Sequence, residues 1–211
     1  MSYYIYPFEL KPLNYNYDNL EPFIDAATVC FHHDKHLRTY TNNLNKALES
    51  HLTFQSWDLI RLVSEYDKLP LELQKPVRNN AGGVYNHNLY FDIMMPGGSK
   101  MPIDTLKNLI DKKFGNYDNF KAEFKNIALG TFGSGYACLV SNNEGQIEII
   151  SVSNQDTTLS RSLYTIILID VWEHSYYLKY QNRRNEYIDN WFNLINWEVA
   201  ENNYKRITSK V

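Results

Sequence analysis

Cysteine is scarce in this chain of 211 residues: Cys30 and Cys138 are its only two, and they form no C-x-x-C pair. Their scarcity argues against a disulfide framework and against a zinc site made of thiolates, and it is typical of a reducing cytosol. Long apolar runs are also missing: none approaches the roughly 18 residues that span a bilayer, and the N-terminus lacks the pattern of a signal peptide. We therefore expect a cytoplasmic protein without a membrane partner.

Neither sign of charge dominates the chain. The formal net charge is −3, so no general attraction to nucleic acid or to acidic lipid is predicted. Three common motifs are absent as well: a glycine-rich phosphate loop, H-E-x-x-H, and a glutamate three residues before a histidine. Their absence argues against a phosphate-binding loop, a zincin and a ferritin-like di-iron site.

The most informative stretch is an apolar run that ends in a carboxylate. Ile166 to Ile169 lead directly into Asp170, and His174 follows four residues later. Such a run predicts a strand buried on both faces. A buried carboxylate at its end needs a neutralising partner, because an unpaired buried charge is costly. A metal cation would serve; the alternatives are a helix cap or an arginine partner.

Two long helices upstream carry further histidines. Residues 28–48 are expected to be helical, with His32, His36 and Tyr40 four apart on one face. Residues 71–94 form a second predicted helix, whose inner stripe includes His87. If these helices pair antiparallel, His87 points into the same interior as His32. Gly83, one turn before His87, indicates either a close helix crossing or room for a side chain from elsewhere.

The second half of the chain changes character after a Pro- and Gly-rich linker at residues 96–102. We place a domain boundary there, giving residues 1–96 and 97–211. Two amphipathic helices are expected next, then a hairpin at 136–140 and 146–153, and a third strand at 164–171. The predicted fold class is α+β: an N-terminal antiparallel α-hairpin domain, then an α/β domain with a three-stranded antiparallel sheet.

Four residues are candidates for one metal ion, and they would lie between the two domains: His32, His87, Asp170 and His174. Three imidazoles and one carboxylate suit a first-row metal such as manganese, iron or zinc. The carboxylate stabilises a higher oxidation state, which favours a redox metal over zinc.

Five strings in the sequence resemble the iron/manganese superoxide dismutases: FHHDKHLRTY, NNAGGVYNHN, TFGSGYACLV, SNQD and DVWEHSYYLKY. The resemblance runs over nearly the whole chain. It implies an enzyme that disproportionates two superoxide anions to oxygen and hydrogen peroxide. It also implies a metal held by the four candidate ligands and one solvent molecule.

The same resemblance assigns roles around the metal. Gln155 would hydrogen-bond the solvent on the metal, and Tyr40 and His36 would form the gate of the substrate channel. The residues support the first role independently, because Gly83 leaves space for a glutamine from the hairpin loop. In this family the pairing of that glycine with Gln155 goes with manganese. We therefore expect one manganese ion per subunit, with iron as the alternative.

The resemblance also implies a homodimer or a tetramer whose sites are completed across the interface. Tyr177 would reach His36 of the other subunit, and Glu173 would accept a hydrogen bond from its His174. Trp172 corresponds to an aromatic wall of the pocket. Arg184 and Lys35 are the candidates for steering an anionic substrate.

The chain departs from the family at pocket positions usually filled by tryptophan, which here carry Tyr136 and Phe91. Cys138 replaces another large aromatic residue, and Val84 is closer to what iron members carry. These departures leave one alternative from another class: a metal-binding protein on the same scaffold that has lost turnover.

Overall fold

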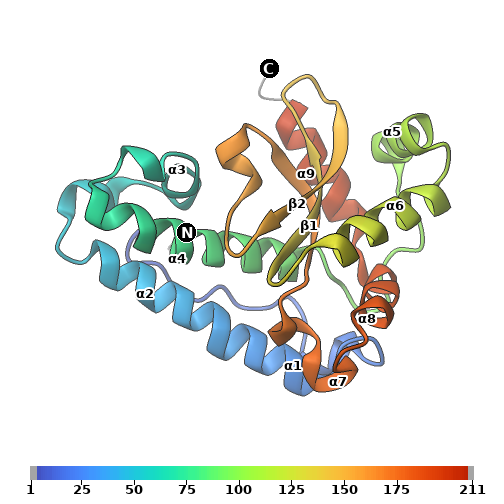
Figure 1. Cartoon of the computed structure of the whole chain (residues 1–211), viewed down its shortest axis with the longest axis horizontal. Coiled ribbons are helices and arrows are strands. Elements are labelled where there is room, and N and C mark those ends of the chain that lie inside the picture. Colours follow the sequence, from blue (N-terminus) through green and yellow to red (C-terminus); the bar gives the residue numbers. More distant parts are fainter. Residues whose placement is uncertain (1–3, 209–211) are drawn as a thin grey trace.

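The computed structural model describes residues 4–208 of the chain. Helices make up most of the described part and enclose one three-stranded sheet (Figure 1). The α-helices and strands, in chain order, are α1 Ala26–Phe31, α2 Arg38–Leu48, α3 Leu59–Ser64, α4 Leu71–Asp92, α5 Asp104–Phe114, α6 Tyr117–Gly130, β1 Gly135–Ser141, β2 Ile147–Ser153, β3 Tyr164–Asp170, α7 Tyr177–Tyr180, α8 Arg184–Trp191 and α9 Trp197–Thr208.

The first long helix is continuous from α1 to α2 but is not α-helical throughout. Asp25 caps its start, where the side chain accepts a hydrogen bond from the Thr28 amide at 3.1 Å. Between α1 and α2, residues His32–Leu37 form a π-helical segment. The helix predicted over residues 28–48 is therefore confirmed in extent, with a wider turn where the histidines lie. Segments of this kind are frequent at functional sites.

Helix α4 runs beside this first helix in the opposite direction, which forms the predicted antiparallel hairpin (Figure 1). Its inner face is buried over most of its length and includes Leu73, Val77, Val84 and His87. The apolar side chains on that face belong to the hydrophobic core, as a three-four spacing requires.

The sheet has the order β2-β1-β3, and both strand pairs are antiparallel. Its central strand, β1, is buried along its whole length, and β3 is buried except at Tyr164. The register places Tyr136 opposite Asp170 and opposite Val152. The sheet thus brings the end of β3 next to Tyr136 on β1.

The N-terminal and C-terminal halves of the chain also contact each other outside the hairpin and the sheet. Met94, just after α4, forms an isolated antiparallel bridge with Ile195, just before α9. The core continues between α6 and α8, where the Phe124 and Trp191 rings stack at 5.7 Å between centroids. Within residues 4–208, no helix is long and apolar enough to cross a membrane. The α+β architecture predicted from the sequence is confirmed.

Candidate metal centre

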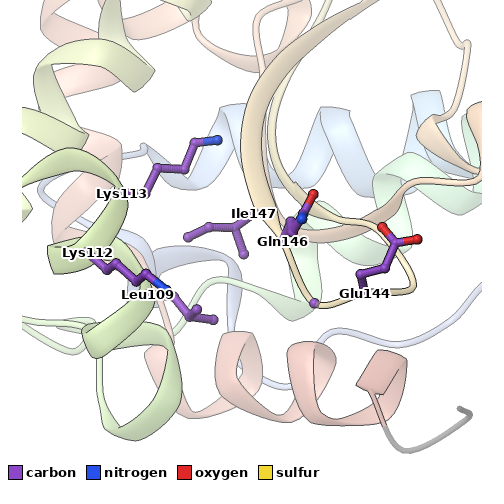
Figure 2. A pocket seen from close by; sticks show the side chains of 7 residues that line it. Leu109, Lys112, Lys113, Glu144, Gln146 and Ile147 are labelled. Carbon is purple, nitrogen blue, oxygen red and sulfur yellow. The ribbon is translucent and has the colours of Figure 1, made fainter.

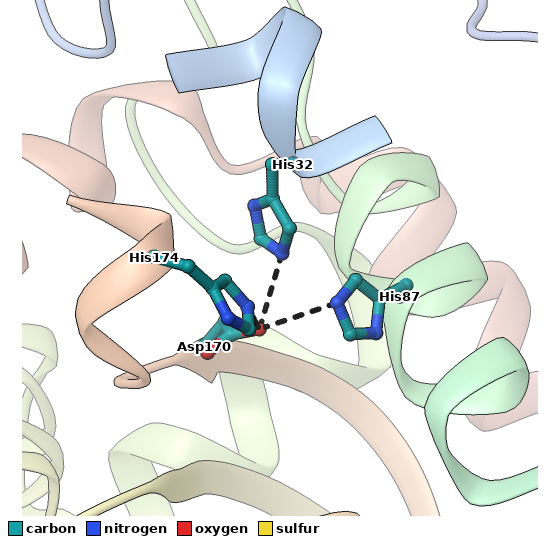
Figure 3. Close-up of side chains that lie close together, drawn as sticks. All are labelled: His32, His87, Asp170 and His174. Atoms are coloured by element: carbon teal, nitrogen blue, oxygen red, sulfur yellow. Dashed lines mark ion pairs between the residues drawn. The ribbon is translucent and has the colours of Figure 1, made fainter. Parts of the chain in front are cut away.

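Four side chains from four segments converge between the hairpin and the sheet (Figure 3). His32 opens the π-helical segment, His87 lies on α4, Asp170 ends β3, and His174 lies in the following 3₁₀ turn. The ligand atoms that they offer all lie within 4.8 Å of one another. Asp170 Oδ2 is 3.3 Å from His32 Nε2, 3.4 Å from His174 Nε2 and 4.0 Å from His87 Nε2. The structure therefore brings all four predicted ligands together.

The pattern of hydrogen bonds around these four side chains is the one expected for a metal site. Within the described part of the chain, the three Nε2 atoms and Asp170 Oδ2 are buried and have no hydrogen-bond partner. The opposite side of two ligands is anchored: Asp170 Oδ1 accepts from the Trp172 amide at 2.8 Å, and His87 Nδ1 donates to the Gly83 carbonyl at 2.7 Å. Buried polar atoms are rarely left unpaired, and anchored ligands with one free atom are typical of metal sites.

The electrostatics of the cluster favour neutral His32 and His87 imidazoles beside an ionised Asp170 carboxylate. Burial lowers the pKa of His32 to about 4 and the pKa of His87 well below its ordinary value. Burial raises the pKa of Asp170, but the His174 and His32 imidazoles outweigh it and hold that pKa below its usual range. Neutral histidine and ionised aspartate are the forms that bind a metal.

A tyrosine pair supports the cluster from behind. The Tyr187 hydroxyl donates to the Asp170 carbonyl at 2.8 Å and lies 2.9 Å from the Tyr90 hydroxyl. Ser175 Oγ donates to the same carbonyl at 2.9 Å. These three residues were not predicted from the sequence, because single tyrosines and serines in a tyrosine-rich chain carry no spacing signal.

Gln155 is the centre of a second buried polar group. Its Nε2 donates to the Tyr40 hydroxyl at 3.1 Å, and its Oε1 accepts from the Tyr136 hydroxyl at 2.9 Å. Asn86 Nδ2 lies 3.5 Å from the same Oε1. We call Gln155, Tyr40, Tyr136 and Asn86 the glutamine cluster. Asn86 is a further residue that the sequence analysis missed, since it lies off the predicted inner stripe of its helix.

The two adjacent glycines of α4, Gly82 and Gly83, have different nearest neighbours. A Cβ on Gly83 would meet the Tyr40 ring first, at 2.5 Å, whereas a Cβ on Gly82 would meet the Gln155 carbonyl oxygen at 2.0 Å. The close approach of Gln155 is therefore made at Gly82, and Gly83 gives its space to Tyr40. Two adjacent glycines look alike in the sequence, and only the direction of approach of each neighbour separates their roles.

Aromatic rings enclose the histidine ligands. His174 stacks on His36 at 4.1 Å and on Trp172 at 5.4 Å between ring centroids. The Phe91 ring lies 5.0 Å from the His32 ring. His36 is half-buried, so this part of the enclosure reaches the surface. The rings restrict the His174 imidazole to one plane.

The remaining predicted residues lie farther out. Arg184 donates to the Tyr176 hydroxyl at 3.0 Å, the Thr131 carbonyl at 2.8 Å and the Gly133 carbonyl at 3.0 Å. It therefore ties the loop before β1 to the segment after His174. Glu173 and Tyr177 are exposed.

An open surface pocket lies apart from the four predicted metal ligands. It lies between α5 and the turn joining β1 to β2 and is lined by Leu109, Lys112, Lys113, Glu144, Gly145, Gln146 and Ile147 (Figure 2). None of the four cluster residues lines it. Burial and unpaired atoms, rather than a hollow in the surface, mark the metal centre.

Fold and site together define a metalloprotein with one buried centre between a helical hairpin and an antiparallel sheet. Comparison with known protein families identifies the family within this class of metalloproteins. Residues 7–95 match the alpha-hairpin domain of iron/manganese superoxide dismutases, and residues 102–203 match the C-terminal domain of the same family. The chain belongs to the iron/manganese superoxide dismutase family.

Individual relatives agree with this assignment. The chain is 46% identical over 200 residues to a protein named Superoxide dismutase [Mn] from Thermus aquaticus, covering 95% of this chain and 98% of that protein. It is 43% identical over 197 residues to Superoxide dismutase [Mn] 2 of Bacillus anthracis, covering 93% and 94%. Superoxide dismutase [Mn] 1 of Leptolyngbya boryana is 42% identical over 206 residues, covering 97% and 83%.

Proposed function

We propose that this chain is a superoxide dismutase that uses one manganese ion per subunit, held by His32, His87, Asp170 and His174. One observation carries the proposal: four buried ligand atoms within 4.8 Å of one another lack hydrogen-bond partners among the described residues. The family assignment and the manganese named for the relatives support the same metal.

The bound metal would supply alternating one-electron oxidation and reduction. Two superoxide anions and two protons then give one oxygen and one hydrogen peroxide. The chain's own residues keep a hydrogen-bonded path for those protons. It runs from the buried Gln155 amide to the Tyr40 hydroxyl, whose ring is half-buried. Burial raises the pKa of Tyr40, so its hydroxyl keeps its proton at neutral pH. His36, four residues before Tyr40 and stacked on His174, would form the gate with Tyr40.

The active form is a homodimer or a tetramer whose sites are completed by a neighbouring subunit. Tyr177 is 48% exposed, and Phe132, on the loop that Arg184 ties to Tyr176, is fully exposed. Large exposed aromatic side chains near a site are typical of interfaces. Glu173 would accept a hydrogen bond from His174 of the partner subunit. Glu173→Ala should therefore weaken association, and an unchanged sedimentation profile would count against this contact.

Three further parts of the proposal concern the whole chain. Arg184 and Lys35 add local positive charge for an anionic substrate. Residues 1–96 and 97–211 form two domains, which the separate family matches at 7–95 and 102–203 support. The protein works in the cytoplasm, in keeping with the free thiols of Cys30 and Cys138.

Metal content and dismutation by metal-replaced preparations test the function. The protein should bind one manganese ion per chain, and the manganese form should turn over superoxide faster than the iron form. Equal rates with both metals would show that iron also serves. Stoichiometric metal without turnover in either form would contradict the enzyme and leave the metal-binding alternative. Tyr136 argues against that alternative, because its hydroxyl still reaches Gln155 from the position usually filled by tryptophan.

A further inference from the structure

The loop that carries Gln155 is held on α4 by residues spaced four apart. Arg78, Gly82 and Asn86 occupy positions i, i+4 and i+8, so they share one face of the helix. The Arg78 guanidinium donates two hydrogen bonds to Asp156, from Nε to Oδ1 and from Nη2 to Oδ2, each 2.7 Å long. Gly82 lies under the Gln155 carbonyl, where a Cβ would find no room.

Asn86 links the position of this loop to the direction of the Gln155 amide. Its Nδ2 lies 3.2 Å from the Asp156 carbonyl, and a carbonyl only accepts, so the Asn86 nitrogen must face the loop. The same nitrogen lies 3.5 Å from Gln155 Oε1. Gln155 therefore turns Oε1 toward Asn86 and Nε2 toward Tyr40.

We propose that Arg78 is a positioning residue for dismutation: by clamping Asp156 it fixes which end of the Gln155 amide faces Tyr40. This inference rests on the proposed function. Nothing in the sequence assigns Arg78 a role, because it lies nine residues before His87 and its side chain is exposed. Its side chain is 47% exposed and that of Asp156 is 30% exposed.

The exposure of the pair separates a positioning role from a structural one. Ion pairs this exposed contribute little to global stability. A bidentate arginine–carboxylate pair nevertheless restricts direction as well as distance. Loss of the clamp should therefore lower turnover and leave the thermal unfolding midpoint and the metal content almost unchanged.

A double-mutant cycle on the manganese-loaded protein tests the proposal. We expect Arg78→Gln to lower kcat by about three- to tenfold with little change in KM, and to shift the visible absorption bands of the bound manganese. In the Gln155→Leu background the same substitution should have no further effect on kcat or on the spectrum, because the residue through which Arg78 acts is gone. The matched control is Lys125→Gln, which breaks a pair with Asp189 at 2.6 Å between α6 and α8.

Two results would overturn the proposal. One is an Arg78→Gln protein with unchanged kcat and spectrum; the other is an equal loss in the wild-type and Gln155→Leu backgrounds. Failure of the proposed function looks different, since the manganese-loaded wild type would then have no turnover at all. In that case the absorption spectra of the wild type and Arg78→Gln would still test the clamp. The spectra need bound manganese but do not depend on turnover.

Discussion

The metal cluster, which consists of His32, His87, Asp170 and His174, lies beside the glutamine cluster in the protein interior. The two clusters differ in whether their buried polar atoms have hydrogen-bond partners. In the metal cluster, four ligand atoms are buried without partners among the described residues. In the glutamine cluster, both ends of the Gln155 amide are paired. Since each unpaired buried polar atom is costly, the first cluster is complete only with a cation.

The contrast in hydrogen bonding indicates the role of each cluster. Four unpaired atoms that converge on one point define where a charge must be bound. The Gln155 amide has a partner at each end, so its direction is fixed, which suits a group that adjusts the chemistry beside it. Substitutions in the metal cluster should therefore abolish metal binding, whereas substitutions in the glutamine cluster should change rates with the metal still in place.

The largest effect is expected from Asp170→Asn. The substitution keeps the shape of the side chain and its contact with the Trp172 amide, but it removes the only negative charge among the four ligands. We expect the purified protein to lose most of its manganese, and with it essentially all dismutation. Metal analysis after dialysis measures this. Asp189→Asn, on the exposed side of α8, is the control. Full metal occupancy in Asp170→Asn would contradict the assigned ligand set.

The sequence predicted the metal cluster well for a physical reason. Asp170 ends a strand buried on both faces, so its charge demands a partner. The residue spacing of each long helix places His32 or His87 on the face that points to the interior. The sheet and the helical hairpin followed from equally regular patterns. A periodic pattern and a charge at the end of a buried strand can both be recognised within a short stretch of sequence.

The glutamine cluster could be predicted only in part, because its contacts depend on how distant segments approach one another. The choice between Gly82 and Gly83 is set by where the Gln155 loop and the Tyr40 ring come close. Asn86 joins through a loop contact that no helical period indicates. The π-helical turn at His32 was missed for a related reason, since a spacing of four residues suits an α-helix equally well.

Gln155→Leu should have the next largest effect and sharpen the contrast. Leucine fills a similar volume but cannot donate to Tyr40 or accept from Tyr136. We expect kcat to fall by about ten- to a hundredfold while manganese content stays within error of the wild type. Rate measurements on preparations of known metal content test this. Loss of metal in step with activity would mean that the two clusters are not separable.

Tyr136→Phe should have a smaller effect of the same kind. It removes one hydroxyl that donates to Gln155 Oε1 at 2.9 Å and leaves Asn86 at 3.5 Å as the remaining donor. We expect kcat to fall by about two- to fivefold. The buried hydroxyl position would be empty, so the unfolding midpoint should be measured in parallel. An unchanged rate would show that Asn86 alone directs the amide. Tyr204→Phe, which removes a hydroxyl bonded to the Gly145 carbonyl far from the centre, is the matched control.

The smallest expected effect concerns the stability of the metal-free protein, and its sign follows from His32. Burial lowers the pKa of this histidine from 6.5 to about 4, so between these pH values the unfolded chain binds a proton that the folded chain does not. Stability is therefore fully present above about pH 6.5 and is lost as the pH falls toward 4. We expect the unfolding midpoint of the metal-free protein to drop by roughly 5 °C between pH 7 and pH 5.

The matched comparison is the manganese-loaded protein over the same pH range. A bound cation competes with protons for the same imidazole nitrogens and stabilises only the folded state, so its midpoint should stay nearly constant until the metal dissociates. Metal-free His32→Gln should lose part of the pH dependence, since that titrating group is removed. If the metal-free midpoint instead rises on acidification, His32 is protonated in the folded protein, and the unpaired atoms of the metal cluster have another explanation.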